Sequence, residues 1–343
     1  MRRNRRSGRG RQRRFADAGE QRHQGSLAHE GPAALPAGPS PSYALPVQRA
    51  TLIVNPYSSA VDPRRIAAVE EALRTQVELT TELTRGPGHA TELAAGAAES
   101  ADAVIVLGGD GTYNEVVNGL DAQTPIGFLP GGGTSVLPRA LGLPRDAVDA
   151  ARAVAGALGA GRTRRISLGR VNGRRFAFSA GVGVDAEVVR RIDTRGRTDQ
   201  GKRPGDFAFA GAVLGVFAEA HFRFDPVLDI EDVGRAAFLL VANGSPYTFA
   251  GPLPLRLVGG VRFEGGLGYV APSAVRPAVL PRLLARAARG RLGDDPLVHA
   301  ATDVDRISIR ADRPLPLQVD GEDLGDVEEA VFEAERDALT VLV

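Results

Sequence analysis

From Arg49 onward, short apolar runs alternate with segments of helical periodicity, and this alternation constrains the fold more than any other feature of the chain. Asp62 followed by Pro63 is a typical helix start, with a capping side chain and a proline in the first turn. Strands that alternate with helices through short links form a parallel sheet wrapped by helices. The expected strands are residues 51–54, 77–83, 103–107 and 125–129, and the expected helices are residues 63–74, 89–99 and 146–158.

After residue 162 the pattern changes to short strands and turns, which predicts an antiparallel β-sandwich or barrel. Asn172-Gly173 is the strongest hairpin signal in this half, because these residue types tolerate the positive φ of a tight two-residue turn. The expected strands are residues 165–171, 174–179, 236–242, 256–263, 267–270, 306–310 and 316–320.

The composition excludes several classes of site. There are no cysteines, so disulfides, iron–sulfur clusters and thiol nucleophiles are excluded. The five histidines share no ligand spacing that would indicate catalytic zinc. Lys202 is the only lysine, so neither a P-loop nor a strand-borne kinase lysine is present. Any phosphate must therefore be bound by backbone amides, arginine and metal.

Residues 1–48 differ from the rest of the chain in charge. They hold nine arginines and three acidic residues, and end in a stretch rich in Pro, Gly and Ala. Such a segment buries too little apolar surface to offset its ordering entropy, so we predict a disordered basic tail. The longest strongly apolar run, residues 207–218, is shorter than the ~20 residues of a membrane span. A core helix is the favoured interpretation of this run, and an apolar wall for a lipid tail is the alternative.

Two glycine-rich turns follow successive strands of the predicted parallel sheet. They are Gly108-Gly109-Asp110-Gly111 and Pro130-Gly131-Gly132-Gly133. The carboxyl ends of parallel strands meet at one edge, so both turns and Asn55-Pro56 face the side where open α/β sheets bind ligands. Glycine lets backbone amides approach an anion closely, so we predict a phosphate cradle there. Asp110 is suited to a Mg2+ ion beside the phosphate.

Asp320-Gly321-Glu322 ends a short apolar strand far downstream. Two carboxylates around a glycine can bind a metal ion or accept the proton of a hydroxyl group. A hairpin turn without a chemical role is the more common explanation of such a triplet, and the three residues alone leave both open.

Together these segments resemble one family over residues 49–343, the diacylglycerol kinase catalytic-domain lipid kinases. This family includes sphingosine and ceramide kinases and is more distantly similar to NAD kinase and phosphofructokinase. Residues 108–119 match the whole GGDGTxNEVxNG signature of the family, and residues 319–322 match its VDGE element. Asn55-Pro56, Thr84 with Gly88-His89-Ala90, residues 130–141 and residues 180–186 are similar to further family elements.

The resemblance implies an ATP-dependent lipid kinase that uses Mg2+ and phosphorylates a hydroxyl group of a diacylglycerol or sphingoid-like lipid. The implied fold is α/β plus β. It has a Rossmann-like α/β nucleotide domain (residues 49–162), an antiparallel β-sandwich lipid-binding domain (163–322) and a C-terminal segment (323–343) that packs back on the first domain. As partners we expect a lipid substrate, peripheral contact with a membrane surface and no nucleic acid, with a homodimer left open. The expected location is the cytoplasm, with a peripheral position at the inner face of the membrane left open.

The resemblance also assigns roles to residues. Glu322, Asp320 and Asp110 are the implied catalytic residues, and Asp110 is also the implied metal ligand. The implied ATP-binding residues are Asn55, Pro56, Ser58, Ser59, Thr84, Gly108, Gly109, Asp110, Gly111, Thr112, Asn114, Glu115, Gly132, Gly133 and Thr134.

The chain departs from the family at several positions. Ser135 stands where Asn is usual, and Pro138 where a small helical residue is common. Residues 264–268 replace an acidic element that holds a structural magnesium ion in many bacterial members, so we predict that this ion is absent. These departures support a rival interpretation, a nucleotide- or lipid-binding homologue that has lost efficient turnover.

Residues 181–186 also fit a dinucleotide-binding fingerprint. That interpretation requires a further strand with a terminal acidic residue about twenty positions on. The polar residues 194–200 stand there instead, so an NAD oxidoreductase is not favoured.

Overall fold

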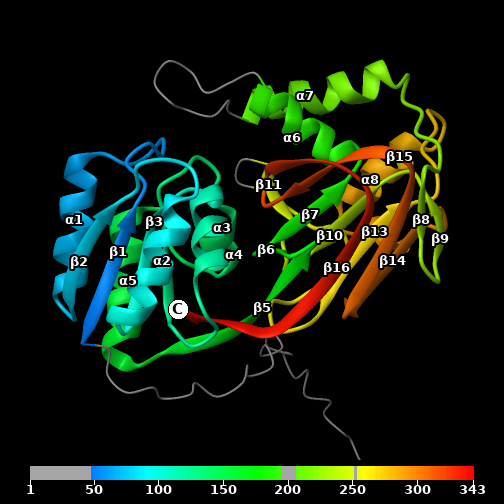
Figure 1. Ribbon diagram of the computed structural model, residues 1–343. Helices are drawn as coiled ribbons and strands as arrows, with labels where there is room; N and C mark the ends of the chain where they lie inside the picture. The colour runs from blue at the N-terminus through cyan, green and yellow to red at the C-terminus, as the bar shows by residue number, and fades with distance from the viewer. Residues whose placement is uncertain (1–47, 195–205, 251–252) are drawn as a thin grey trace, which may run out of the picture. The chain divides into compact units, whose positions relative to one another are not determined.

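The alternation of strands and helices after Arg49 forms a parallel sheet with helices on both faces (Figure 1). The computed structural model describes residues 48–194, 206–250 and 253–343, so the predicted basic tail lies outside the described residues. The parallel strands lie in the order β2-β1-β3-β4. The elements of this α/β region are β1 (Arg49–Val54), α1 (Pro63–Arg74), β2 (Glu78–Leu83), α2 (His89–Ser100), β3 (Ala103–Gly108), α3 (Asp110–Gly119), β4 (Ile126–Pro130), α4 (Val136–Ala140) and α5 (Ala147–Ala160).

Local capping explains where two of these helices begin. The Asp62 carboxylate accepts the backbone N–H of Arg65 at 2.9 Å, and Pro63 occupies the first turn of α1. The Asp146 carboxylate accepts two N–H groups of the first turn of α5. Such caps satisfy N–H groups that have no partner within the helix. The predicted parallel order of strands and helices is confirmed.

The C-terminal half, which we call the antiparallel region, continues the same sheet. Its antiparallel character is confirmed, but hydrogen bonding does not divide its strands into two sheets. Apart from the separate β11–β12 pair, the described strands join one fourteen-stranded sheet. The elements are β5 (Thr163–Val171), β6 (Arg174–Phe176), β7 (Ser179–Val182), α6 (Val184–Thr194), α7 (Asp206–Glu219), β8 (Leu228–Ile230), β9 (Gly234–Ala236), β10 (Leu239–Ala242), β11 (Thr248–Ala250), β12 (Leu253–Leu255), β13 (Leu267–Pro272), α8 (Leu280–Ala288), β14 (Val298–Val304), β15 (Arg306–Val319) and β16 (Glu322–Leu342).

One predicted strand is wrong. Residues 256–263 form turns and bends, and β12 ends before them at Leu255. Gly260 has a φ of 90°, which lies outside the extended region and interrupts a strand. Val261 and Phe263 are nevertheless buried, so this apolar run contributes to the core without joining the sheet.

The last strand, β16, connects the two regions. It pairs antiparallel with β15 and β5 over most of its length. Near its end, Val341 pairs with Ile126 of the parallel strand β4. The C-terminus therefore lies in the α/β region (Figure 1).

Two tight turns fix charged residues at defined places. Asn172-Gly173 connects β5 to β6, and Asp320-Gly321 connects β15 to β16, with positive φ at all four residues. This is the type I′ geometry that Asn-Gly and Asp-Gly pairs favour, and the predicted hairpin at Asn172-Gly173 is confirmed. Arg174 and Glu322 are the first residues after these turns, and each pairs with the residue that precedes its turn.

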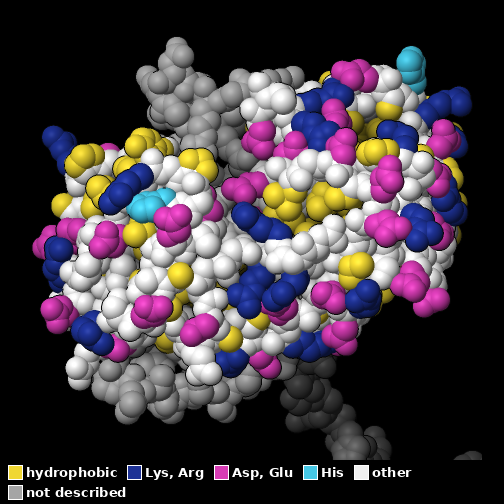
Figure 2. Space-filling view, viewed as in Figure 1, with side chains coloured by type: hydrophobic (Ala, Val, Ile, Leu, Met, Phe, Trp, Pro, Cys, Tyr) yellow, Lys and Arg dark blue, Asp and Glu magenta, His cyan; other side chains and the backbone are white. Residues whose placement is uncertain are grey.

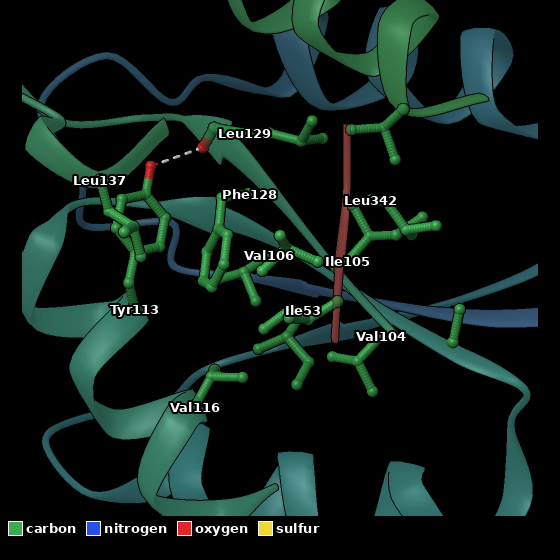
Figure 3. Close-up of a cluster of buried hydrophobic side chains, with 14 of the residues drawn as sticks. Ile53, Val104, Ile105, Val106, Tyr113, Val116, Phe128, Leu129, Leu137 and Leu342 are labelled. Carbon is green, nitrogen blue, oxygen red and sulfur yellow. Dashed lines mark hydrogen bonds between the residues drawn. The ribbon is translucent and has the colours of Figure 1, made fainter. Parts of the chain in front are cut away.

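The core of the α/β region surrounds Tyr113 of α3 (Figure 3). The buried ring meets Phe128 edge to face at a centroid distance of 5.3 Å. The Tyr113 hydroxyl donates toward the carbonyl oxygens of Gly108 (2.7 Å) and Leu129 (2.8 Å). Burial raises the pKa of Tyr113 well above its usual value, so the hydroxyl remains a donor. Tyr113 thus ties together the ends of β3 and β4, from which both glycine-rich turns start.

The apolar run at residues 207–218 lies in helix α7, which confirms the predicted helix. Ala212 and Val216 pack against α6, whereas Leu214 is 62% exposed. Within the described ranges, no helix is long and apolar enough to cross a membrane.

Replacing Tyr113 by Phe should destabilise the protein by about 1–3 kcal/mol, because two buried carbonyl groups lose their hydroxyl donor. Urea unfolding of the wild type and of Tyr113→Phe measures this, with a lower midpoint and an unchanged slope expected. Tyr57→Phe is the matched control, since Tyr57 is exposed. Equal midpoints for Tyr113→Phe and the wild type would show that the hydroxyl does not stabilise the strand ends.

Candidate functional site

The two glycine-rich turns pack backbone against backbone. We call Gly108–Gly111 the first glycine turn and Gly131–Thr134 the second. A Cβ atom on Gly131 would lie 2.9 Å from the nitrogen of Gly108, and one on Gly132 would lie 2.9 Å from the Cα of Gly109. The N–H of Gly131 donates to the Gly108 carbonyl at 2.7 Å. No side chain fits between the turns, so they form one surface made mainly of backbone.

The turn after β1 is joined to this surface. Asn55 Nδ2 donates to Thr112 Oγ1 at 2.9 Å, and the N–H of Ala60 donates to the Gly131 carbonyl at 2.9 Å. Pro56, Ser58 and Ser59 lie in the same turn, with Ser59 exposed. Thr84 is buried at the end of β2, next in the sheet, where its N–H donates to the Val54 carbonyl. The structure therefore brings together the predicted residues of the turn after β1 and of the two glycine turns, and Thr84 lies on the neighbouring strand.

Asp110 links the first glycine turn to the segment that follows the second. Its Oδ1 accepts the N–H of Val136 at 2.7 Å and that of Leu137 at 3.4 Å, at the start of α4. Ser135 precedes them with a φ of 44°, in the left-handed region that Asn adopts more readily than Ser. Pro138 lies in the first turn of α4, where proline is tolerated, so this departure does not disturb the helix.

Glu322 lies at the first glycine turn. A Cβ atom on Gly111 would clash with Glu322 Oε1, so this carboxylate oxygen rests directly against the turn. Glu322 Oε2 accepts from Arg174 Nη2 at 3.3 Å, and the Glu322 side chain is 33% exposed. A carboxylate of the antiparallel region therefore reaches the glycine turns of the α/β region.

Asp320 does not share this position, although only Gly321 separates it from Glu322. Asp320 is 1% exposed, and burial is the main cause that raises its pKa. Its two oxygens accept the N–H groups of Ala177, Phe178 and Ser179 and the Nδ2 of Asn114, at 2.7–3.0 Å. Both oxygens of Asp320 are therefore bonded within the core, whereas Asp320 was expected to share proton transfer with Glu322.

Asn114 and Glu115, which were both expected to bind ATP, contact other parts of the chain. Asn114 is fully buried, donates to Asp320 and accepts from Arg174 Nε and Nη2. Glu115 accepts the N–H of Ala90 at 3.1 Å in the first turn of α2. Asparagine at position 114 thus joins α3 to the antiparallel region, a role that sequence reasoning missed. The presence of asparagine at both 114 and 118, one helical turn apart, was the available signal.

A cavity of about 520 Å³ lies in the antiparallel region between α6, α7 and β15. Its lining includes the apolar residues Val184, Val216, Phe224 and Leu315 and the charged residues Glu187, Arg223, Asp225 and Arg313. On the face drawn in Figure 2, hydrophobic side chains also gather around β7 and β11.

A buried polar network connects helix α6 to the Asp320-Gly321 turn. Asp185 Oδ2 accepts from Tyr247 Oη and from Gln318 Nε2, both at 2.6 Å. Gln318 Oε1 in turn accepts the N–H of Gly321 at 2.9 Å. Burial raises the pKa of Asp185. The helix that lines the cavity is thus fixed to the turn that carries Glu322.

The residues at the glycine turns fit a magnesium ion only in part. Among the described residues, no group of three or more His, Cys, Asp or Glu side chains forms a metal site. Magnesium beside phosphates is commonly held by one or two carboxylates together with phosphate oxygens and water. Asp110 and Glu322 on either side of Gly111 suit that arrangement, whereas a cage made only of protein ligands is not supported. Glu264, in the departing 264–268 element, is paired with Arg164.

Comparison with known proteins shows what this chain is similar to. Residues 49–171 match the family model described as the diacylglycerol kinase catalytic domain. A diacylglycerol kinase of Bacillus subtilis (strain 168) is 37% identical over 163 residues, which cover 46% of this chain and about half (52%) of the relative. A diacylglycerol kinase of Staphylococcus saprophyticus is 27% identical over 287 residues, covering 80% of this chain and 89% of that protein.

A crystal structure of a diacylglycerol kinase from Bacillus anthracis str. Sterne has the same fold. It aligns with a TM-score of 0.65 at 19% identity, over 87% of this chain and 98% of that one. Residues 49–171 thus match the diacylglycerol kinase catalytic domain, and the chain is similar to diacylglycerol kinases in sequence and in fold.

Proposed function

We propose that this chain is an ATP-dependent lipid kinase that transfers the γ-phosphoryl group of ATP to a hydroxyl group of diacylglycerol or a sphingoid-like lipid. One observation carries the proposal: the Glu322 carboxylate rests against Gly111 in the first glycine turn. Phosphoryl transfer requires a phosphate site and a group that accepts the proton of the attacking hydroxyl, within reach of each other. Glu322 and the glycine turns meet that requirement.

The glycine turns are suited to the phosphates of ATP. Gly109, Gly132 and Gly133 have no side chain and are at least partly exposed, so the backbone of both turns can approach a bulky anion there. Asn55 and Thr112 fix the turn after β1 beside them. In this proposal, Asn55 to Ser59, Thr84, and the two glycine turns hold the nucleotide. Asn114 and Glu115 support these turns and do not contact ATP.

Glu322 is the proposed general base. Its carboxylate takes the proton of the lipid hydroxyl while the hydroxyl oxygen forms a bond to the γ-phosphorus. The bond between the γ-phosphorus and the bridging oxygen breaks, and ADP leaves with that oxygen. Magnesium, when bound, would neutralise charge on the phosphates, and Asp110 is the residue proposed to hold it.

The cavity beside α6 supports an acceptor that carries an apolar body. Val216, Phe224 and Leu315 offer apolar contact, while Asp185 and Gln318 connect its wall to the turn that holds Glu322. Lipid substrates of different classes share this combination of a hydroxyl group and an apolar body, so the cavity supports the class and not one lipid. Contact with a membrane surface, where such acceptors reside, belongs to the same proposal.

The second candidate is a homologue that binds nucleotide and lipid without efficient turnover. Ser135 is the observation in its favour, because it adopts a left-handed conformation that is strained for residues other than glycine, Asn and Asp. Its Oγ lies 3.3 Å from the nitrogen of Gly132 and accepts from it, which closes the second glycine turn.

Glu322→Gln should lower the turnover of lipid phosphorylation by ~100–10,000-fold, the usual contribution of a general base. Glutamine keeps the shape of the side chain but does not accept the proton. Transfer of label from γ-labelled ATP to a lipid in mixed micelles, together with ATP affinity by calorimetry, gives turnover and binding on the same protein. Glu333→Gln on the same strand is the matched control, since Glu333 is about half exposed and pairs with Arg306.

The two candidates differ in this experiment. The kinase proposal expects labelled lipid from the wild type and the Glu333→Gln control, and almost none from Glu322→Gln at unchanged ATP affinity. A wild type that binds ATP and lipid without forming labelled lipid supports the binding homologue. Full turnover in Glu322→Gln would remove Glu322 as the base.

Gly132→Ala should weaken ATP binding by at least about tenfold, because the new Cβ atom meets the backbone of Gly109 and forces the turns apart. Calorimetric titration with ATP tests this. Gly156→Ala is the matched control, since its Cβ atom on α5 meets nothing within 4 Å and alanine favours a helix. If Gly132→Ala bound ATP as tightly as the wild type, the backbone surface would not be the phosphate site.

A further inference from the structure

Arg174 and Glu322 occupy equivalent places in two different hairpins. Arg174 follows the Asn172-Gly173 turn, and Glu322 follows the Asp320-Gly321 turn. Each turn has two residues with positive φ and is closed by a strand pair, so each charged side chain starts from a fixed backbone position. Two hairpins from distant parts of the sequence therefore present opposite charges to one another.

The guanidinium group of Arg174 connects Glu322 to the glycine signature. Its Nη2 lies 2.6 Å from Asn114 Oδ1 and 3.3 Å from Glu322 Oε2, and its Nε lies 3.0 Å from the same Asn114 oxygen. Asn114 is itself held by Asp320, whose carboxylate is buried. Arg174 is thus anchored to the core through Asn114 and also reaches Glu322.

The two oxygens of Glu322 have different surroundings. Oε2 is bonded to Arg174, while Oε1 rests against Gly111. Fixing one oxygen of a carboxylate determines where the other one points. Arg174 therefore sets the oxygen that faces the first glycine turn.

Negative charge surrounds Glu322, and this makes its contact with Arg174 important. Asp110 is adjacent to Gly111, and the phosphates of ATP would add further negative charge beside the glycine turns. The chain has a single lysine, Lys202, which lies outside the described residues. Arg175, the neighbour of Arg174, is bonded to Glu335 and to the carbonyl of Leu120. Arg174 thus supplies positive charge directly at the Glu322 carboxylate.

We propose that Arg174 is a positioning residue for phosphoryl transfer, which holds Glu322 with Oε1 toward the first glycine turn. This role rests on the proposed kinase function and deepens it. It acts through Glu322, so it affects turnover and leaves the binding of ATP in place. A displacement of about 1 Å in a catalytic group can cost about 100-fold in rate, so the effect is measurable.

The test combines Arg174→Gln and Arg174→Lys with Glu322→Gln. Turnover, KM for ATP, ATP affinity by calorimetry and melting temperature are measured for each single variant and for the Arg174→Gln/Glu322→Gln double variant. Arg306→Gln is the matched control, because Arg306 also pairs with a glutamate on β16 but lies at the surface. We expect Arg174→Gln to lower kcat about 10–100-fold with KM for ATP within about threefold. Arg174→Lys should fall between it and the wild type, because lysine keeps the charge without the fork of donors.

In the Glu322→Gln background, Arg174→Gln should reduce turnover by less than about twofold further, since both changes remove one function. A full additional loss in that background would show that Arg174 acts independently of Glu322 and would overturn the proposal. A loss confined to KM for ATP would do the same, because it would make Arg174 a nucleotide contact. An active wild type with unimpaired Arg174→Gln overturns this role alone, whereas an inactive wild type overturns the kinase function and this role with it.

Discussion

The hydrogen bond between Asn114 and Asp320 is the contact on which the arrangement of the site depends. It joins helix α3, which begins within the first glycine turn, to the turn that carries Glu322. Asp320 also accepts three backbone N–H groups of residues 177–179, so the start of β7 is fixed at the same point. A buried carboxylate that lost one of these donors would carry an uncompensated desolvation cost, typically about 1–3 kcal/mol or more for a charged group. The partners are therefore held in one geometry.

The residues of the glycine signature, 108–119, have different roles. Gly111 keeps the turn free of a side chain where Glu322 approaches it, and Gly108 leaves room for the side chain of Thr112. Tyr113 anchors the ends of β3 and β4 beneath the turns. The asparagines bind the antiparallel region: Asn114 contacts Asp320 and Arg174, and Asn118 exchanges hydrogen bonds with the backbone of Arg175. The first turn of α3 thus forms part of the proposed phosphate site. The polar face of the same helix binds the antiparallel region, which carries the proposed base.

Much of the fold could be predicted because local rules decide it. The parallel region follows from buried strand runs and helix caps such as Asp62, and the two hairpins follow from Asn-Gly and Asp-Gly pairs. The false strand at residues 256–263 had the right apolar residues, but Gly260 turns the backbone out of the extended region. Strand β16 is only partly predictable because it carries many acidic residues. Its glutamates pair with arginines of β15, as in Arg306–Glu333 and Arg310–Glu329, and such cross-strand partners are not visible in one sequence.

The candidate site could be predicted to a similar extent. As in the fold, the contacts between residues far apart in the sequence were missed. The glycine turns, Asp110 and Glu322 are brought together as expected, since strand ends and a specific motif define them. The burial of Asp320 and Asn114 could not be foreseen, because each looks like a reactive or ligand-binding polar residue until its partner is known. Arg174 carries no sequence signal for the same reason. Its importance depends on two hairpins that meet only in the folded chain.

Calorimetry with ATP on Asn114→Ala tests the central claim most directly, when the melting temperature is measured on the same sample. If Asn114 joins α3 to the antiparallel region, the variant should melt at a lower temperature, because Asp320 and Arg174 both lose a buried partner. The ATP affinity of the folded variant should remain within about threefold of the wild type, a difference of less than about 1 kcal/mol. An unchanged melting temperature with ATP affinity reduced about tenfold or more would make Asn114 a nucleotide contact, and would contradict its role as the link between α3 and the antiparallel region.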